Sequence, residues 1–324
     1  MSGAYVFIDR SQFPENVRRD LLESLRARAL NHKFHYESYK QTAKWLALHE
    51  AHSPARRDPS CQRIYDDAFN AAVSTANCSR LHVIGLGCGG GQKEARLLQL
   101  LRERSEVNYT ASDVSLPLVL TAREAALPFL SEDRCHAIVC DLATTSELSA
   151  TLDDIGRNAR RIVTLFGIVP NFEPAPLLSR LALLLHPEDL LLLSANLTPG
   201  DDYTAGIKKV LPQYDNPLTR DWLLTLLLDL GFERDDGELK FTIETDPLRL
   251  QRIAAHFELK RPRELRVFGE TIFFCTEERI RLFFSYRHSP RTIRSLLGEH
   301  GFEVPGEWLN DSGEEGLLLC RKRN

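Results

Sequence analysis

The stretch LHVIGLGCGGGQKEARLLQLLRERSEVNYTASD, residues 81–113, carries the clearest structural pattern in the chain. An apolar run over residues 81–84 leads into five glycines within seven residues, from Gly85 to Gly91, and then into leucines that alternate with charged residues. This order predicts a strand, a tight loop and the start of a helix. Glycine permits positive φ and leaves no Cβ between the main chain and a ligand, and the first turn of a helix offers unpaired N–H groups. The loop is therefore predicted to bind a ligand at close range.

A second apolar run, residues 107–111, predicts a strand that ends near Asp113. A carboxylate at this position can accept hydrogen bonds from the two hydroxyls of a ribose, so we expect an adenosine-containing cofactor. Gly85, Gly87 and Gly90 fit the pattern G-x-G-x-x-G, and Asp113 follows Gly90 by 23 residues. This spacing is close to the roughly 20 residues expected of an NAD fingerprint. Similar glycine loops occur in S-adenosylmethionine (SAM) enzymes, and a glycine-rich turn can also serve chain reversal alone. The motif leaves these three interpretations open.

Composition excludes several classes of protein. The 324 residues suffice for one large domain with elaborations or for two domains. Basic and acidic residues nearly cancel, 41 against 45, and a net charge of −4 predicts no nucleic-acid partner. No signal-like apolar core and no run of membrane-spanning length occurs in the sequence, so we expect a cytoplasmic protein without a membrane partner.

The seven cysteines are scattered and form no C-x-x-C pair. They are expected to be reduced thiols rather than a disulfide framework. The sequence also lacks H-E-x-x-H and paired Cys/His spacings, and we therefore predict no metal site.

After Asp113 the chain continues to alternate strands and helices. Apolar runs at residues 136–142, 160–167 and 189–198 predict three more strands, and a leucine-rich helix is expected over residues 175–185. Strands this continuously apolar are typical of a parallel sheet buried on both faces, so the predicted fold is α/β, a Rossmann-like doubly wound sheet. Ligands bind such sheets outside the carboxyl ends of the strands. The residues expected along this rim are Gly87, Asp113, Asp141, Phe166 and Asn171.

Asp141 follows the third predicted strand and admits two interpretations. Its carboxylate, or a neighbouring main-chain group, can hold the amino group of an adenine. Alternatively the carboxylate caps a helix that begins in the Thr- and Ser-containing segment 142–146. The sequence favours neither.

Two further regions flank or interrupt the alternation. Residues 1–78 show helical spacing and predict an N-terminal helical cap, in which Tyr36 and Tyr39 are candidate site residues. Residues 200–270 contain an apolar helix, DWLLTLLLDLGF, and a charge-rich stretch, and predict an inserted substrate or lid region. The predicted sheet core comprises residues 79–199 and 271–324.

The end of the chain predicts an antiparallel finish to the sheet. Apolar runs at 270–275 and 278–286 precede a helix over residues 290–300 and a final strand at 316–322. An NAD-binding domain would more often continue in parallel. The pattern therefore favours a methyltransferase.

With these motifs assembled, the sequence resembles the SAM-dependent methyltransferases of the histidine-specific family, which trimethylate the α-amino group of histidine on the way to ergothioneine. The resemblance extends from about Lys33 to Arg321. It is carried by the glycine loop with Lys93, by VTLFGIVPNFEP around Asn171, by DWLLTLLLDLGFE and by RIRLFFSYRHS. It implies a class I methyltransferase fold with N-terminal helices, an inserted substrate domain, and SAM as cofactor.

The resemblance also implies roles for individual residues. Lys93 and the loop glycines would hold the methionine part of SAM, Asp113 the ribose and Asp141 the adenine. Asn171 would contact the acceptor, with Tyr39 as a second catalytic candidate. The complete set of expected cofactor-binding residues is Gly85, Gly87, Gly89, Gly90, Lys93, Asp113, Ser115, Asp141, Leu142, Phe166 and Gly167. The expected acceptor-binding residues are Tyr36, Tyr203, Phe283 and Ser285.

The chain departs from the family at two places that bear on the acceptor. Residues 53–56 read Ser-Pro-Ala-Arg, where the family has a Tyr-Pro-Thr-Arg turn with a substrate-contacting tyrosine. Phe283 aligns with the glutamate that grips the imidazole of histidine, and a phenylalanine cannot accept the imidazole N–H. Histidine is therefore not the expected substrate, and a more apolar or aromatic acceptor is favoured.

The expected function is methyl transfer to a small molecule, namely an amine of an amino acid or related metabolite, by a monomer or homodimer. One alternative is an NAD(P)-dependent oxidoreductase. Tyr36 and Lys40 do fit a Tyr-x-x-x-Lys spacing, but both precede the glycine loop and its sheet. The other is a non-catalytic SAM-binding protein in which Phe283 and Phe284 fill the acceptor pocket.

Overall fold

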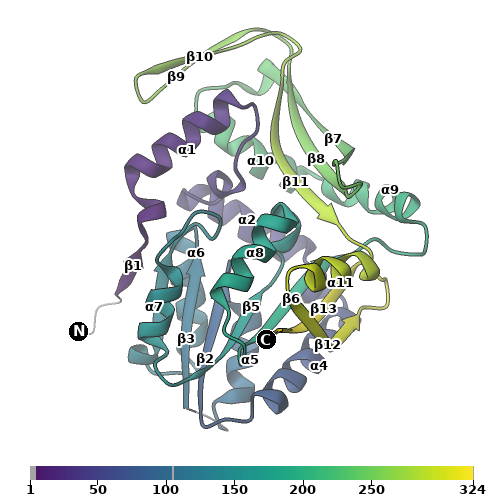
Figure 1. The fold of residues 1–324 in the computed structure, drawn as a ribbon. Coiled ribbons are helices and arrows are strands. Elements are labelled where there is room, and N and C mark those ends of the chain that lie inside the picture. Colours follow the sequence, from purple (N-terminus) through teal and green to yellow (C-terminus); the bar gives the residue numbers. More distant parts are fainter. Residues whose placement is uncertain (1–4, 104–105, 324) are drawn as a thin grey trace. The chain divides into compact units, whose positions relative to one another are not determined.

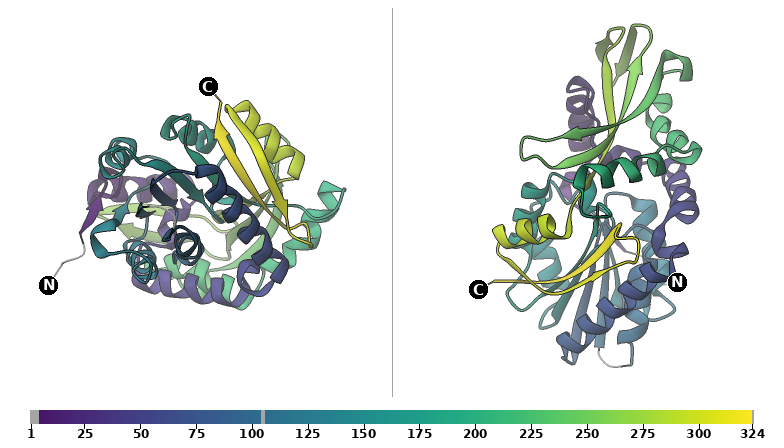
Figure 2. Two further views of the ribbon diagram at one scale, coloured as in Figure 1. Left: turned by 90° about the horizontal axis from the view of Figure 1, so that it is seen from below. Right: turned by 90° about the vertical axis from the view of Figure 1, so that its right-hand side faces the viewer.

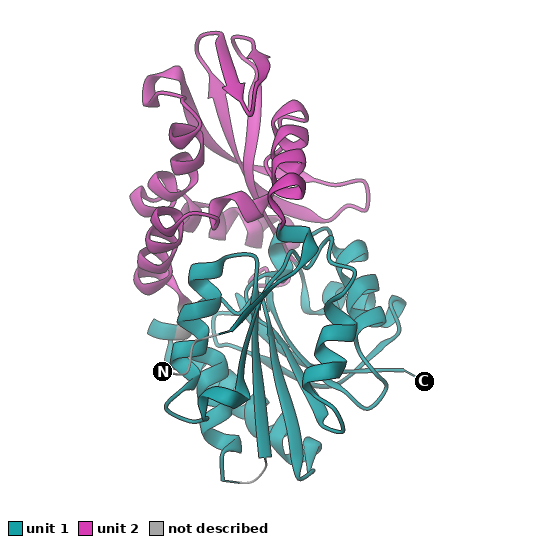
Figure 3. Cartoon of the chain, turned by 90° about the vertical axis from the view of Figure 1, so that its left-hand side faces the viewer, with its two compact units in different colours: residues 1–12, 54–197, 288–324 teal, residues 13–53, 198–287 magenta. Residues whose placement is uncertain are grey.

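The computed structural model describes residues 5–103 and 106–323, and only the backbone of Pro54 and Ala55. By its internal contacts the chain divides into two compact units, coloured separately in Figure 3. Unit 1 comprises residues 1–12, 54–197 and 288–324, and unit 2 comprises residues 13–53 and 198–287. The predicted division differs, because it placed residues 1–12 and 54–78 with the helical cap and residues 271–287 with the sheet.

Unit 1 is built on an eight-stranded sheet of order β1-β4-β3-β2-β5-β6-β13-β12 (Figure 1). Six strands are parallel, whereas β13 runs antiparallel to β6 and β12 antiparallel to β13. The strands are β1 (Val6–Ile8), β2 (Arg80–Leu86), β3 (Glu106–Asp113), β4 (Cys135–Val139), β5 (Arg160–Leu165), β6 (Leu190–Asn196), β12 (Phe302–Leu309) and β13 (Glu315–Lys322). The predicted doubly wound α/β sheet is confirmed.

Helices cover both faces of this sheet. Helices α4, α5 and α6 contact one another on one face, and α7, α8 and α11 lie on the other (Figures 1 and 2). The helices of unit 1 are α3 (Pro54–Arg57), α4 (Pro59–Ala76), α5 (Gln92–Leu101), α6 (Leu116–Ala126), α7 (Leu148–Ile155), α8 (Pro174–Leu184) and α11 (Pro290–Glu299). Short 3-10 turns are η1 (Arg10–Gln12), η3 (Glu132–Arg134) and η4 (Val169–Asn171).

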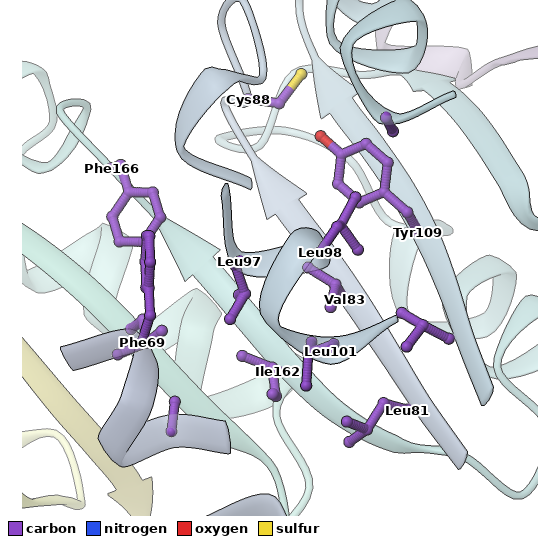
Figure 4. Close-up of a cluster of buried hydrophobic side chains, with 14 of the residues drawn as sticks. Phe69, Leu81, Val83, Cys88, Leu97, Leu98, Leu101, Tyr109, Ile162 and Phe166 are labelled. Carbon is purple, nitrogen blue, oxygen red and sulfur yellow. The ribbon is translucent and has the colours of Figure 1, made fainter. Parts of the chain in front are cut away.

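The main core of unit 1 explains why the glycine loop is held firmly. Leu81 and Val83 alternate along β2 and face Leu97, Leu98 and Leu101 of α5, and all five side chains are buried (Figure 4). Each such side chain stabilises the fold by about 2 kcal/mol. Because strand and helix are packed along their length, the loop between them is fixed at both ends.

The first strand corrects the prediction that residues 1–78 are helical. Val6, Phe7 and Ile8 pair in parallel with residues 137–139 of β4, and the amide of Asp9 donates to the carbonyl of Val139 at 2.9 Å. A strand of three residues is too short to show a period in the sequence. The helical part of the prediction is confirmed for residues 14–26, 39–52 and 59–76, which form α1, α2 and α4.

Unit 2 contains a three-stranded antiparallel sheet of order β11-β8-β7, a hairpin of β9 and β10, and four α-helices. Its strands are β7 (Gly237–Thr245), β8 (Gln251–Leu259), β9 (Arg263–Val267), β10 (Glu270–Phe274) and β11 (Arg279–Arg287). Its helices are α1 (Pro14–Arg26), α2 (Tyr39–His52), α9 (Tyr203–Tyr214) and α10 (Pro217–Asp229), with 3-10 turns η2 (His32–His35) and η5 (Arg234–Asp236).

The predicted antiparallel finish is present and includes the predicted final strand, residues 316–322, as β13, but the two apolar runs before α11 do not belong to it. Residues 279–287 form β11, which pairs with β8 in unit 2 and takes no part in the large sheet. The hairpin of β12 and β13 closes the sheet instead, next to α11 (Figure 2). Apolar alternation identifies a strand but does not identify its partner, and β12 carries too many polar residues to be recognised from the sequence. In the described part of the chain, no helix has the length and apolar character needed to cross a membrane.

Candidate cofactor site

The glycine loop connects β2 to α5 and adopts a backbone that only glycine accepts readily. Gly87 and Gly91 have φ of +63° and +73°. A Cβ on Gly91 would lie 2.6 Å from the Cα of Ala122 in α6, so this glycine is required for close packing of the two helices. A Cβ on Gly87 would lie 2.6 Å from a methyl of Ile168, just after β5. The loop thus runs close to the carboxyl ends of β2 and β5.

Asp113, the last residue of β3, ties the loop to the sheet. Its Oδ2 accepts the amide N–H of Gly89 at 3.1 Å, and its Oδ1 accepts that of Ser115 at 3.0 Å. Burial raises the pKa of this carboxyl to about 6, against the opposing effect of the backbone donors. Ser115 in turn caps α6 by accepting the amide of Leu118. A carboxylate has about four acceptor positions, so these bonds leave capacity for ligand hydroxyls.

Asp141, just beyond β4, caps a turn. Its Oδ1 accepts the amide of Ala143 at 2.9 Å, and its carbonyl accepts the amides of Thr144 and Thr145. The amide of Asp141 donates to the hydroxyl of Ser11 at 3.0 Å. The capping interpretation therefore has direct structural support, although the segment forms a turn and not a helix. Leu142 lies within this turn and is half-buried.

Phe166, Gly167 and Asn171 follow the end of β5. Phe166 is buried against the rings of Tyr65 and Phe69, with ring centroids 5.4 and 5.9 Å away. The amide of Gly167 donates to the hydroxyl of Ser194 at 2.8 Å. Asn171 ends η4 and is half-buried. The structure thus brings the five predicted rim residues to the carboxyl ends of the parallel strands β2 to β5.

Lys93, the second residue of α5, has partners that the sequence did not indicate. Its Nζ donates to the hydroxyl of Tyr65 at 2.5 Å and lies 3.9 Å from Oε1 of Glu315. The ammonium also lies over the rings of Tyr65 and Phe166, 4.3 and 5.5 Å from their centroids. A cation is therefore held beside the glycine loop.

Two of the candidate acceptor residues of unit 2, Phe283 and Tyr36, belong to a cluster of aromatic side chains. The ring of Phe283 lies 5.1 Å from that of His32, 6.0 Å from Trp222 and 6.1 Å from Tyr214. Tyr36 contacts Trp45 and Trp222. We call Phe283, His32, Trp222, Tyr214 and Tyr36 the aromatic cluster.

Ser285 lies beside this cluster and is already bonded. Its hydroxyl is 2.9 Å from that of Tyr214, which also accepts a hydrogen bond from Arg287 at 3.0 Å. Ser285 is therefore part of a polar chain within unit 2.

The two remaining tyrosines differ sharply. The hydroxyl of Tyr203 donates to the carbonyl of Arg287 at 2.5 Å and accepts the amide of Gln251 at 2.9 Å, so it joins α9 to β8 and β11. Tyr39, at the start of α2, is 80% exposed. The hydroxyl of Tyr203 is therefore fixed between α9, β8 and β11, whereas the side chain of Tyr39 is open to solvent.

A family model described as histidine-specific, SAM-dependent methyltransferase matches residues 63–322. The matched segment spans most of the chain and includes the glycine loop, Asp113, Asn171 and β13. The chain belongs to this family. It is a SAM-dependent methyltransferase with a class I methyltransferase fold, and its cofactor is SAM.

Solved methyltransferases resemble this methyltransferase in part. A SAM-dependent methyltransferase from Clostridium acetobutylicum is 13% identical with a TM-score of 0.45, over 87% of this chain and 99% of its own. The 1,6-didemethyltoxoflavin-N1-methyltransferase of Burkholderia thailandensis is 12% identical with a TM-score of 0.45, over 88% and 89%. The CcbJ methyltransferase of Streptomyces caelestis is 14% identical with a TM-score of 0.42, over 82% and 96%. No curated protein matches the chain.

Family membership removes the oxidoreductase alternative. Lys40, the lysine of the Tyr-x-x-x-Lys spacing, forms an ion pair with Asp229 at 2.6 Å within unit 2. The remaining question for this methyltransferase is which residues hold SAM and what the acceptor is.

One acidic group in the methyltransferase could be mistaken for a metal site. Among the described residues, Glu233, Asp235 and Asp236 lie close enough together to share a cation. Arg261 already donates to all three, at 2.8, 3.0 and 2.6 Å. The guanidinium thus takes the place that an ion would occupy.

Sequence reasoning missed Tyr65, Glu315 and Cys61 of unit 1. Tyr65 and Glu315 are 250 positions apart in the chain and meet only through folding. No motif marks them, because Cys61 and Tyr65 lie in an amphipathic helix and Glu315 stands at the start of a strand far from both in the sequence. The apolar residues at spacings of three and four along residues 61–76 do indicate that Cys61 and Tyr65 belong to the buried face of this helix.

Proposed function

We propose that this methyltransferase binds SAM at the carboxyl ends of β2 and β3 and methylates an amine of a small molecule other than histidine. The observation that carries the cofactor half is Asp113. A buried carboxylate that accepts an N–H of the glycine loop, at the end of the strand next to it, has the chemistry to accept ribose hydroxyls.

The donor set of unit 1 fits the rest of SAM. The loop supplies main-chain N–H groups and the N-terminus of α5, and Lys93 supplies a fixed cation for the carboxylate of the methionine part. In the proposal the cofactor-binding residues are Gly85, Gly87, Gly89, Gly90, Lys93, Asp113, Ser115, Asp141, Leu142, Phe166 and Gly167. Asp141 would contribute with its turn, since its Oδ1 already caps Ala143.

The acceptor half of the proposal rests on Phe283. This side chain is 8% exposed and lies within an aromatic cluster, where an apolar or aromatic acceptor would be favoured over an imidazole that needs an anionic partner. Asn171 and Tyr39 remain the proposed catalytic residues, and Tyr36, Tyr203, Phe283 and Ser285 the proposed acceptor-binding residues. The proposal assigns Asn171, with its amide, to orienting the acceptor's amino group.

SAM, when bound, would supply a methyl group on a sulfonium. The methyl group would pass in line to the nitrogen of the amine, and the sulfur would leave with the bonding electrons as the thioether of S-adenosylhomocysteine. The protein has to orient the amine lone pair, exclude water and let the amine lose its proton. The apolar surroundings of Phe166 and of the aromatic cluster suit water exclusion, and the amide of Asn171 can hold the acceptor without taking its proton. No strong base is required for this step.

Calorimetric titration with SAM, S-adenosylhomocysteine and NAD(P) tests the cofactor half. Micromolar binding of the first two and none of the nicotinamides is expected. The acceptor half is tested by incubating the protein with SAM and a panel of amino acids and amines, and by measuring S-adenosylhomocysteine formed. Turnover of an aromatic or apolar amine without turnover of histidine supports the proposal, whereas preferential turnover of histidine contradicts it.

A further inference from the structure

Four polar side chains meet beside the glycine loop in unit 1. Cys61 and Tyr65 come from α4, Lys93 from α5 and Glu315 from the first residue of β13. Tyr65 is 3% exposed and Glu315 8% exposed, whereas the side chain of Lys93 is 22% exposed. The group therefore has a buried acidic end and a more accessible cationic end.

The hydrogen bonds within this group are donated toward Glu315, either directly or through Tyr65. The hydroxyl of Tyr65 donates to Oε1 of Glu315 at 2.5 Å, and the thiol of Cys61 donates to Oε2 at 3.2 Å. The ammonium of Lys93 donates to the hydroxyl of Tyr65 at 2.5 Å. Burial and the adjacent Glu315 raise the pKa of Tyr65 well above its ordinary value, so the hydroxyl keeps its proton and can both donate and accept.

A buried carboxylate is costly unless donors and a cation compensate it. Here both oxygens of Glu315 are bonded, and the cation is Lys93. Lys93 stands in the first turn of α5, where the positive end of the helix dipole disfavours a cation, and Glu315 offsets that effect. Without this partner, the long side chain of Lys93 would extend into solvent in many conformations.

We propose that Tyr65 and Glu315 are positioning residues that hold the ammonium of Lys93 beside the glycine loop, where it receives the carboxylate of the methionine part of SAM. The inference rests on the proposed SAM site. An ammonium has three N–H donors, and the bond to Tyr65 occupies one, so the carboxylate can bind without displacing the tyrosine. Because the lysine is held in place before the ligand arrives, binding loses less side-chain entropy.

The test compares two ligands that differ only at this end. S-adenosylhomocysteine carries the amino-acid carboxylate, whereas 5′-methylthioadenosine has the adenosine and sulfur without it. Dissociation constants for both are measured by calorimetry for wild type, Lys93→Met, Tyr65→Phe and Glu315→Gln. Glu314→Gln, the same change at the neighbouring residue, is the matched control. Thermal unfolding of each variant is recorded alongside.

We expect Lys93→Met, Tyr65→Phe and Glu315→Gln each to weaken S-adenosylhomocysteine binding by about tenfold, the effect of one charge-assisted hydrogen bond. Methylthioadenosine binding should change less than about twofold in all of them, because its contacts lie elsewhere. Glu314→Gln should bind both ligands as wild type does.

Other outcomes overturn the inference in distinguishable ways. If Tyr65→Phe and Glu315→Gln retain full S-adenosylhomocysteine affinity while Lys93→Met loses it, these two residues do not position the lysine. Tighter binding by Glu315→Gln would mean that Glu315 competes with the ligand. Equal loss of both ligands in a variant with a lowered melting temperature would show a purely structural role. If wild type binds neither ligand, the proposed SAM site itself is wrong.

Discussion

The candidate binding groups of the two units differ in kind: they are largely main-chain groups in unit 1 and side chains in unit 2. At the carboxyl ends of β2 and β3 in unit 1, the groups available to a ligand are main-chain N–H groups of a glycine loop and the carboxylate of Asp113. That carboxylate is fixed by the N–H of Gly89 in the loop and by the N–H of Ser115. In unit 2 the candidates are side chains, and the hydroxyls of Ser285 and Tyr203 already have partners within the unit. Ser285 bonds to Tyr214, which bonds to Arg287, and Tyr203 bonds to the main chain of Arg287 and Gln251. A site made of backbone can bind one cofactor across many sequences, whereas a site made of side chains changes its ligand with each substitution.

If backbone geometry sets the site of unit 1, an added methyl group should be most damaging there. Gly91→Ala introduces a Cβ at positive φ that also meets the backbone of Ala122 at 2.6 Å. We expect a loss of about 3 kcal/mol or more in the free energy of unfolding. Gly269→Ala in unit 2 has similar strain, with φ of +82°, but meets no atom within 4 Å, and should cost about 1 kcal/mol. Urea unfolding followed by circular dichroism measures both, and equal losses would contradict the prediction.

The second contrast concerns cofactor binding. Asp113→Ala should weaken S-adenosylhomocysteine binding by about 1 to 3 kcal/mol, because the ribose hydroxyls lose their acceptor. Ser285→Ala in unit 2 should leave this affinity unchanged and affect only turnover of the acceptor. Calorimetry with both variants checks the separation. Unchanged affinity in Asp113→Ala would remove the ribose assignment.

The glycine loop and Asp113 could be recognised from the sequence because their roles depend on residue type at fixed spacing. The doubly wound sheet could also be predicted, since strands buried on both faces are continuously apolar. The partner of each strand could not be predicted. The sequence of residues 279–287 does not indicate pairing with β8, and a strand of three residues such as β1 is too short for a periodic pattern. The contact between Tyr65 and Glu315 depends on the tertiary arrangement of α4 and β13, which no local sequence pattern predicts.

One buried residue in each unit, Asp113 in unit 1 and His35 in unit 2, should respond to acid in opposite directions. Burial raises the pKa of Asp113 from 3.8 to about 6, so the folded state binds more protons than the unfolded state between these values. Its contribution to stability is present below pH 3.8 and is lost as the pH rises through 6. Burial lowers the pKa of His35 from 6.5 to about 4, so its contribution is present above pH 6.5 and is lost as the pH falls through 4.

Single substitutions isolate these two effects. From pH 4 to pH 7, the free energy of unfolding of wild type should fall relative to that of Asp113→Asn. Over the same range it should rise relative to that of His35→Gln. Urea unfolding at several pH values gives both differences. Parallel curves for wild type and either variant would show that the residue does not titrate in this range.

The smallest expected effect concerns two tyrosines with opposite surroundings. Tyr109 of β3 is fully buried, and within residues 5–103 and 106–323 its hydroxyl finds no hydrogen-bond partner. Tyr203 of unit 2 uses its hydroxyl twice. Removing an unpaired buried hydroxyl relieves a desolvation cost, so Tyr109→Phe should be neutral or stabilise by up to about 1 kcal/mol. Tyr203→Phe should cost about 1 to 2 kcal/mol, because it leaves a partly buried amide and carbonyl without their partner. Chemical denaturation measures both. A loss in Tyr109→Phe equal to that in Tyr203→Phe would mean that the Tyr109 hydroxyl has a partner, with ordered water beneath the glycine loop the first to be sought.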